Sequence, residues 1–379
     1  MKAARHSRHR MRTAVLVALV LAVLFIAIES CSPTPAPTSE NNTNPALWFV
    51  EWLRDHHMGF VVAVAEDVFY TVDHPPEGGP ALRHLPSRPE ASPQLPGSAP
   101  APGQRAISGP KNVRPVIRPA LPQEGVWTPA GQTVGGRYPI LTTTLRPDPL
   151  HPSVVAGLAW IDTSQTRLVL VPGLKEPRSR ALPPGPGRVP LQDRSSLLAT
   201  FNSGFKTQDG HGGFIANGQV YVRPREGLGT IAIYRDGSVK IGAWGSEIQP
   251  SSQIVYLRQN LPLLVDQGRI SPAVNDRWPW VADTVGNNVL VWRSGLGVDA
   301  HGNLIYAAAN AISESGLAGL LRRAGAVRAM ALDENTYFVD FFTYAAAGGA
   351  EPSKLLPSMR NPKDRYLVPD QRDFFMVLK

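Results

Sequence analysis

The sequence predicts an α+β protein, with a mixed but largely antiparallel, hairpin-rich sheet and a few helices packed on it. Two observations support this prediction. Short apolar runs alternate with turn signals over residues 124–379, and two of these, Asn217-Gly218 and Asp236-Gly237, favour hairpins because such residues accept positive φ. Few segments, chiefly 313–325, show the 3.6-residue apolar spacing of an amphipathic helix. We expect an N-terminal transmembrane helix and a proline-rich linker before this domain.

Composition limits both the number of domains and the class of partner. Proline makes up 37 of the 379 residues, about twice the usual share of roughly 5%, so one domain of roughly 250 residues is expected. The net charge is +8, but most of the excess stands in the first 12 residues, where no acid occurs. The remainder is nearly balanced, which excludes an electrostatic footprint for nucleic acid.

The N-terminus predicts a membrane anchor. A basic tip at 1–12 is expected to stay in the cytoplasm, and the uncharged apolar run that follows forms a single membrane span over 13–30. A cleaved signal peptide and a lipoprotein attached through Cys31 are the alternatives. Cys31 is the only cysteine, so an internal disulfide is excluded. The expected location is the cell membrane, with the C-terminal domain outside the cytoplasm.

Three segments connect the anchor to the domain. Residues 31–45 read as a linker, because Pro, Ser, Thr and Asn dominate them. Residues 46–73 predict a short amphipathic helix followed by a strand. Residues 74–123 are dense in proline and predict a spacer or a wrapping arm. Globular character is expected over 124–379.

Within 124–379 the elements follow in order. Two strands flank a turn at 162–165, the two hairpins come next, and a strand pair surrounds the loop 299–303. A helix then begins after Ser313 or Ser315 and ends before Gly325. The buried strand "AVRAMALD" follows, which suits a crossover on a mixed sheet. The run "RDFFMVLK" predicts a closing strand.

Motifs of several common enzyme classes are absent. The sequence contains no GxxxxGK[ST], HExxH, GxSxG or paired CxxC pattern. We therefore predict no cofactor and no metal site.

Polar residues at strand and loop ends mark four candidate places. The first is "FNSGFKTQDGHGG", whose glycines permit close backbone approach to a ligand while amide, amine and imidazole groups supply donors. The other three are Asp266 after an apolar strand, Arg293 with the nearby Asp299, and the pair Asp333-Glu334. For each place, an ordinary loop, turn or strand-end role is the alternative. If the strand continues through Asp333 and Glu334, their side chains point to opposite faces.

Taken in order, "FNSGF", "LPLLVDQG", "RSGLGVDAHG" and "AGAVRAMALD" resemble the phosphodiester glycosidase family. The family pattern runs N-G-G-F-F, L-V-x-x-G, R-[TS]-x-x-G with D-x-x-G, and L-D-G-G-G-S. The resemblance covers roughly residues 124–379, and the N-terminal layout is similar to that of membrane-anchored actinobacterial members. In this sequence Ser203 replaces a glycine and Lys206 a phenylalanine of the pattern, and "LDENTY" replaces its glycine-rich end.

The resemblance implies a site and an activity. Asn202, Arg293 and Asp333 fall on the family's asparagine, arginine and aspartate, and are expected to be catalytic. Substrate contacts are expected from a second set of residues: Gly204, Lys206, His211, Asp266, Asp299 and Glu334. Asp333 is expected to face the oxocarbenium-like centre, with Arg293 against the phosphate and Asp266 or Asp299 as the second carboxylate. The expected substrate is a sugar-1-phosphodiester or a related cell-envelope glycan. The alternative is a non-catalytic protein that binds glycans or phosphoglycans.

Overall fold

The computed structural model describes residues 53, 75–79, 82–86, 109–179, 182–210, 212–274 and 289–379. The chain divides into two compact units, of which the larger consists of Pro75–Val281 and Val289–Lys379. The smaller unit, Met1–His74 with Ala282–Asn288, contains Leu53 as its only described residue. The predicted basic tip, anchor and linker therefore lie outside the described residues, as do most of 46–73 and much of 74–123. Within the described ranges, no helix is long and apolar enough to cross a membrane.

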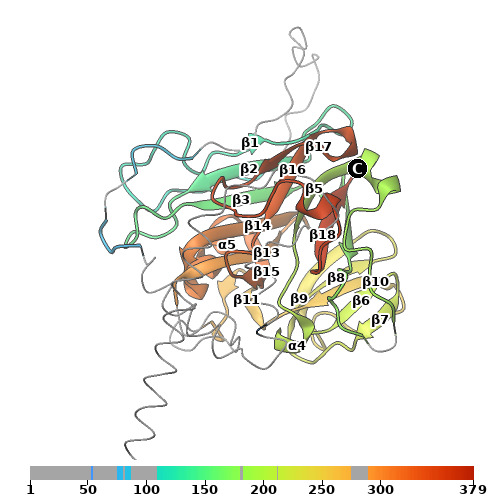
Figure 1. Ribbon diagram of the computed structural model, residues 1–379. Coiled ribbons are helices and arrows are strands. Elements are labelled where there is room, and N and C mark those ends of the chain that lie inside the picture. The colour runs from blue at the N-terminus through green and yellow to red at the C-terminus, as the bar shows by residue number, and fades with distance from the viewer. Residues whose placement is uncertain are drawn as a thin grey trace, which may run out of the picture. The chain divides into compact units, whose positions relative to one another are not determined.

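The larger unit is built from three sheets (Figure 1). The first has eight strands, in the order β1 (Thr128–Pro129), β2 (Ile140–Leu145), β3 (Ala156–Ile161), β14 (Leu304–Ile312), β13 (Val291–Asp299), β15 (Ala326–Glu334), β11 (Leu263–Asp266) and β12 (Arg269–Ile270). The second has the order β7 (Gln219–Val222), β6 (Phe214–Ala216), β10 (Ile254–Gln259), β8 (Gly229–Tyr234) and β9 (Val239–Ala243). The third has the order β17 (Ala350–Lys354), β16 (Phe341–Ala346), β5 (Leu197–Asn202), β18 (Phe374–Leu378) and β4 (Arg167–Val171).

Helices are few in the described residues. They are α4 (Thr207–Gly210), α5 (Glu314–Arg323) and the 3-10 turns Leu191–Ser196, Ala347–Gly349 and Arg365–Leu367. Neighbouring strands of the three sheets are antiparallel throughout. The predicted sheet-rich α+β class, largely antiparallel with few helices, is therefore confirmed.

The hairpins form where the turn dipeptides predict them. Asn217 and Gly218 join β6 to β7 with φ of 50° and 74°, a region that suits glycine and asparagine. Gly237, with φ of 86°, lies in the turn between β8 and β9. β13 and β14 pair around the loop that follows Asp299. These three strand pairs were predictable because each depends on neighbouring residues only.

The predicted crossover is formed by β14, α5 and β15, but it produces no parallel pair. β13 lies between β14 and β15 and is antiparallel to both. β14 and β15 therefore run parallel without touching along their edges. The sequence predicted a mixed sheet, but every pair of neighbouring strands in it is antiparallel.

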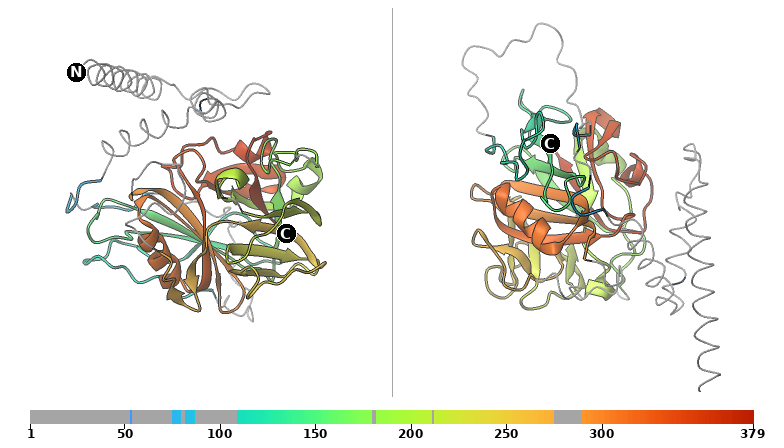
Figure 2. Two further views of the ribbon diagram at one scale, coloured as in Figure 1. Left: turned by 90° about the horizontal axis from the view of Figure 1, so that it is seen from below. Right: turned by 90° about the vertical axis from the view of Figure 1, so that its left-hand side faces the viewer.

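The helix α5 covers the outer face of the eight-stranded sheet (Figure 2). It starts at the N-cap Ser313, whose Oγ accepts a hydrogen bond from Gly316 N at 3.1 Å, and Gly325 follows its end with φ of 107°. Close packing of the helix depends on small residues in the strands. A Cβ on Gly295 would lie 2.9 Å from Leu321 Cδ1. The leucine face predicted from the sequence is buried, with Leu317, Leu320 and Leu321 all in the core.

The inner face of the eight-stranded sheet meets both smaller sheets in one core. Side chains alternate along β14, where Tyr306 and Ala308 enter this core while Ile305 and Ala307 pack beneath α5. β18, the last strand of the chain, lies inside the third sheet between β5 and β4. Phe374 pairs with Asn202 there, which places the start of β18 beside the end of β5.

Candidate active site

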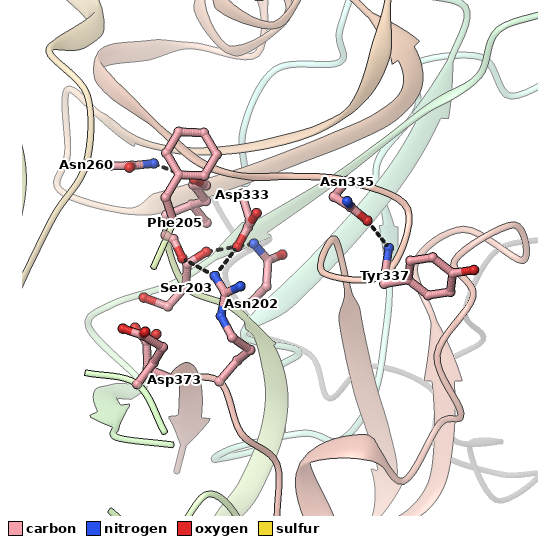
Figure 3. A network of polar contacts seen from close by, with 12 residues as sticks. Asn202, Ser203, Phe205, Asn260, Asp333, Asn335, Tyr337 and Asp373 are labelled. Atoms are coloured by element: carbon pink, nitrogen blue, oxygen red, sulfur yellow. Dashed lines mark hydrogen bonds and ion pairs between the residues drawn. The ribbon is translucent and has the colours of Figure 1, made fainter. Parts of the chain in front are cut away.

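Polar side chains from all three sheets meet at one end of the inner core (Figure 3). Their elements are the end of β5, the end of β10, the end of β15 and the residues just before β18. The polar residues that meet there are all buried: Asn202, Ser203, Arg258, Asn260, Asp333, Arg372 and Asp373. Burial of so many polar and charged groups requires that they be paired, because an unpaired buried charge is costly.

A β-bulge directs Asp333 into this cluster. Arg293 pairs with Glu334 and Gly295 with Ala331, so Ser294 alone stands opposite two residues of β15. Ser294 Oγ donates to Asp333 O at 3.0 Å and accepts from Asp333 N at 3.2 Å, which fixes the irregularity. Bulges are frequent beside active sites because they re-aim a side chain.

Asp333 forms a buried ion pair with Arg372. Its Oδ2 lies 2.7 Å from Arg372 Nη2, which also donates to Gly204 O at 3.0 Å. The guanidinium of Arg372 lies 4.3 Å from the centre of the Phe338 ring. Burial raises the pKa of Asp333 to about 7; the Arg372 charge opposes this rise and the Asp373 charge adds to it. Burial therefore favours the neutral carboxyl group to a pH well above that at which an exposed aspartate ionises.

A second ion pair lies beside the first. Arg258 Nε donates to Asp373 Oδ2 at 2.9 Å, and Arg258 Nη2 donates to Phe205 O. The two arginines thus bind consecutive carbonyl groups, those of Gly204 and Phe205, and fix the "FNSGF" loop.

Three buried oxygen atoms in this region have no hydrogen-bond partner among the described residues. They are Ser203 Oγ, Asn260 Oδ1 and Asp373 Oδ1. The amide nitrogen of Asn260 is used, since it donates to Ala331 O at 2.9 Å and to Leu332 O. Orphaned buried polar atoms are rare. One hydroxyl and two acceptors in this arrangement suit the hydroxyl groups of a sugar.

Asn202 is bonded to its surroundings at both ends of its amide. Its Oδ1 accepts from Tyr306 OH at 2.8 Å and from Asp340 N at 3.1 Å. Its Nδ2 donates to Ser294 Oγ at 3.0 Å, which links Asn202 to Asp333 through one hydroxyl. Asn202 therefore positions the bulge that carries Asp333.

The side chain of Arg293, on β13, points to the opposite face of the eight-stranded sheet from the side chain of Asp333. Its guanidinium contacts Glu334 and, at 3.3 Å, Glu314 Oε1 at the start of α5. Its Nε donates to Ile312 O at 3.1 Å. The structure thus brings Asn202 and Asp333 together but separates Arg293 and Glu334 from them. Arg372 is the arginine that contacts Asp333.

Asp266 and Asp299 lie toward the other end of β15. Asp266 pairs with Arg328 at 3.1 Å, and Asp299 Oδ1 accepts from His301 N and Asn303 N in the loop after β13. Asp299 is opposite Ala326, seven residues before Asp333, which is about 23 Å along a strand. The carboxylate whose charge raises the pKa of Asp333 is that of Asp373.

The remaining predicted contacts belong to the "FNSGF" loop. Gly204 accepts from Arg372 as described, and a Cβ at this glycine would lie 3.4 Å from Asn260 Cγ. Lys206 is buried, and its carbonyl accepts from Asp209 N and Gly210 N in α4. His211 lies outside the described residues.

The segment that replaces the family's glycines keeps a glycine-like backbone. Asn335 has φ of 116°, where side chains are rarely found. Its Oδ1 accepts from Tyr337 N at 2.9 Å (Figure 3). Asn335 and Tyr337 are both buried.

Four residues of the cluster were not predicted from the sequence, although a pattern in the sequence marks them. Arg258 and Asn260 end the apolar run "IVYLRQN", and Arg372-Asp373 open "FFMVL". Each is a polar residue at the end of an apolar strand, the same signal that marked Asp333. Among the described residues, no group of three or more His, Cys, Asp or Glu side chains is arranged to hold a metal.

Comparison with protein families gives a match over part of the chain. Residues 195–333, from the turn before β5 to Asp333, match the family described as phosphodiester glycosidase. This stretch of the chain belongs to that family, as its motifs indicated.

The chain is also similar to solved structures, at low identity. The catalytic domain of zebrafish N-acetylglucosamine-1-phosphodiester alpha-N-acetylglucosaminidase is 15% identical, with a TM-score of 0.42, over 65% of this chain and 86% of that one. A hypothetical protein from Synechocystis is 15% identical, with a TM-score of 0.36, over 60% of this chain and 59% of that one. A comparison with curated proteins found no match.

Proposed function

We propose that this protein hydrolyses a glycosyl phosphodiester, a sugar joined through its anomeric oxygen to a phosphate diester. One observation carries the proposal: Asp333 is a buried carboxyl group whose pKa burial raises to about 7, beside Arg372 and Asp373. Near neutral pH such a group is populated in both protonation states, which suits catalysis. Membership of residues 195–333 in the phosphodiester glycosidase family supports the same reaction.

The chemistry assigns a role to each group. Water adds to the anomeric carbon while the bond from that carbon to the phosphate oxygen breaks, giving a free sugar and a phosphate monoester. The ionised Asp333 carboxylate would face the oxocarbenium-like transition state. Arg372 would stabilise the charge of the departing phosphate. Ser203 Oγ would donate a hydrogen bond to a sugar hydroxyl or accept one from it. Asn260 Oδ1 and Asp373 Oδ1 would accept hydrogen bonds from sugar hydroxyls.

The test is release of sugar from a synthetic sugar-1-phosphodiester by the wild type and by Asp333→Asn. We expect the variant to lose at least 100-fold in kcat, the scale of a catalytic acid or base. Asp266→Asn is the matched control, because Asp266 pairs with Arg328 away from the cluster. Equal turnover by wild type and Asp333→Asn would refute the role of Asp333.

A second function, glycan binding without catalysis, is favoured by two features. Asp333 is already engaged by Arg372, and the side chain of Asn335 is buried where the family pattern has a glycine. If this function is correct, the wild type binds the diester without releasing sugar, and Asp333→Asn binds it equally well.

We further propose that the protein is exported and anchored by residues 13–30, so that it acts on cell-envelope glycans. The basic residues before the apolar run support this orientation. N-terminal sequencing of the mature protein and membrane fractionation test it. A mature chain that lacks residues 1–30 would show a cleaved signal instead.

A further inference from the structure

A cavity of about 470 Å³ lies at the start of β10, apart from the Asp333 cluster. Its wall includes both predicted hairpin turns, through Asn217, Gly218, Asp236 and Gly237. A Cβ at either glycine would meet nothing within 4 Å, so the turns border open space. The volume falls in the range of roughly 300–1,000 Å³ that is usual for small-ligand sites.

Two arginines line this cavity without a charged partner. Arg167, at the start of β4, and Arg235, beside the β8–β9 turn, are both exposed. Neither guanidinium forms an ion pair or a hydrogen bond within the described part of the chain. Asp236 is the one carboxylate in the lining, and its Oδ1 is occupied by Ser238 N at 2.9 Å and Ser238 Oγ at 2.6 Å. The lining therefore has a net positive charge.

An aromatic side chain with a fixed position completes the lining. Tyr256 is half-buried, and its hydroxyl donates to Asn217 Oδ1 at 2.8 Å, which ties the ring to the β6–β7 turn. Burial raises the pKa of the Tyr256 phenol; the positive charge of Arg167 opposes this rise and the negative charge of Asp193 adds to it. A fixed ring offers an apolar face to the C–H groups of a sugar.

We propose that this cavity binds an anionic sugar, a pyranose bearing a phosphate or carboxylate group. Arg167 and Arg235 bind the anion, because guanidinium groups match the geometry of both phosphate and carboxylate. Tyr256 packs against the sugar ring. This cavity is an accessory site, separate from the Asp333 cluster. Both contain residues of β10: Tyr256 lines the cavity, and Arg258, two residues later and about 7 Å along the strand, belongs to the cluster.

The experiment measures ligand binding by NMR titration of the full-length Asp333→Asn protein. Because this variant is expected to lose at least 100-fold in kcat and none of the probes is a phosphodiester, the result does not depend on whether the proposed hydrolysis is correct. The probes are glucose 1-phosphate, glucuronate, glucose and inorganic phosphate. We expect glucose 1-phosphate or glucuronate to bind with a Kd on the order of 1 mM. We expect both glucose and inorganic phosphate to bind at least 10-fold more weakly than the better of these two.

The variants identify the cavity as the site. Arg167→Gln combined with Arg235→Gln should weaken binding of the anionic sugar at least 10-fold. Tyr256→Leu should weaken binding of the anionic sugar but not that of inorganic phosphate. Arg269→Gln is the control, since Arg269 is an exposed arginine on β12 outside the lining. Thermal unfolding of each variant reports whether it is folded.

Two results would overturn the proposal. If the double arginine variant binds the anionic sugar as the Arg269→Gln protein does, the cavity is not the site. If inorganic phosphate binds as tightly as glucose 1-phosphate, and glucose as tightly as glucuronate, no anionic sugar is recognised.

Discussion

Asp333 is the residue whose surroundings explain most about the candidate site. Burial favours its neutral form, whereas Arg372 at 2.7 Å favours the carboxylate, and burial prevails in raising the pKa to about 7. The charge of Asp373 acts in the same direction as burial because two nearby carboxylates resist joint ionisation. Burial is thus the main reason that the pKa of Asp333 stays high beside an arginine, and Asp373, which follows Arg372 directly in the chain, adds to it.

This pKa predicts how stability depends on pH. In the folded chain Asp333 holds its proton up to about pH 7, whereas at its usual pKa of 3.8 the unfolded chain loses it. The free energy of unfolding should therefore fall as pH rises from about 4 to about 7, by a few kcal/mol. Asp340, whose pKa burial raises to about 6, contributes with the same sign.

Urea unfolding at pH 5 and pH 8 measures this effect. The wild type should lose more stability than Asp333→Asn between these two pH values, since the amide does not titrate. Identical losses in the two proteins would show that Asp333 has an ordinary pKa.

Asn335 gives a second prediction at this scale. Its φ of 116° suits glycine, and its side chain compensates by accepting from Tyr337 N. Asn335→Ala loses that hydrogen bond and keeps the strain, so it should destabilise the fold by about 2–3 kcal/mol. Asn335→Gly loses the bond but relieves the strain, and should stay within about 1 kcal/mol of the wild type. Urea midpoints that rank alanine equal to glycine would contradict this explanation.

At the scale of elements, the site depends on an irregularity of β15. The sequence predicts the strand "AVRAMALD" and the opposite directions of Asp333 and Glu334, and the structure shows both: Asp333 contacts Arg372, and Glu334 contacts Arg293. The bulge opposite Ser294 was not predictable, because it depends on pairing with β13, a partner some 40 residues away. For the same reason, motif order alone grouped Arg293 with Asp333 although the two strands direct these side chains to different faces.

Ser294→Ala tests the importance of this bulge. The hydroxyl is buried and bonds Asn202 Nδ2, Asp333 O and Asp333 N. Its removal should destabilise the fold by about 1–3 kcal/mol and should lower any hydrolytic rate, because Asp333 loses its fixed position. Ser252→Ala, at an exposed position, is the control and should change stability by less than about 0.5 kcal/mol. If the Ser294→Ala protein is as stable as this control, the backbone alone maintains the bulge.

At the scale of the whole unit, local pairings were predictable and sheet assignment was not. Adjacent hairpins follow from turn chemistry, but β3 and β4, which are consecutive in sequence, belong to different sheets. β18 was expected as a closing strand, yet it lies between β5 and β4, more than 170 residues earlier in the chain. Such pairings are decided by how three apolar faces share one core, which a linear pattern does not contain. The ion pairs of the candidate site were not predictable for the same reason, since they join the ends of strands from different sheets.

The position of β18 makes the C-terminus essential to the fold. Its five residues, Phe374–Leu378, are all buried and pair with a strand on each side. Burial of each large apolar side chain contributes about 1.5–3 kcal/mol, so removal of residues 374–379 costs about as much as the whole stability of a typical domain, roughly 5–15 kcal/mol. We expect this truncated protein to show no cooperative thermal transition by circular dichroism and to be digested rapidly by trypsin. Lys379→Ala, which alters only an exposed side chain, should unfold like the wild type. Cooperative unfolding of the truncated protein would mean that β5 and β4 can close the third sheet without β18.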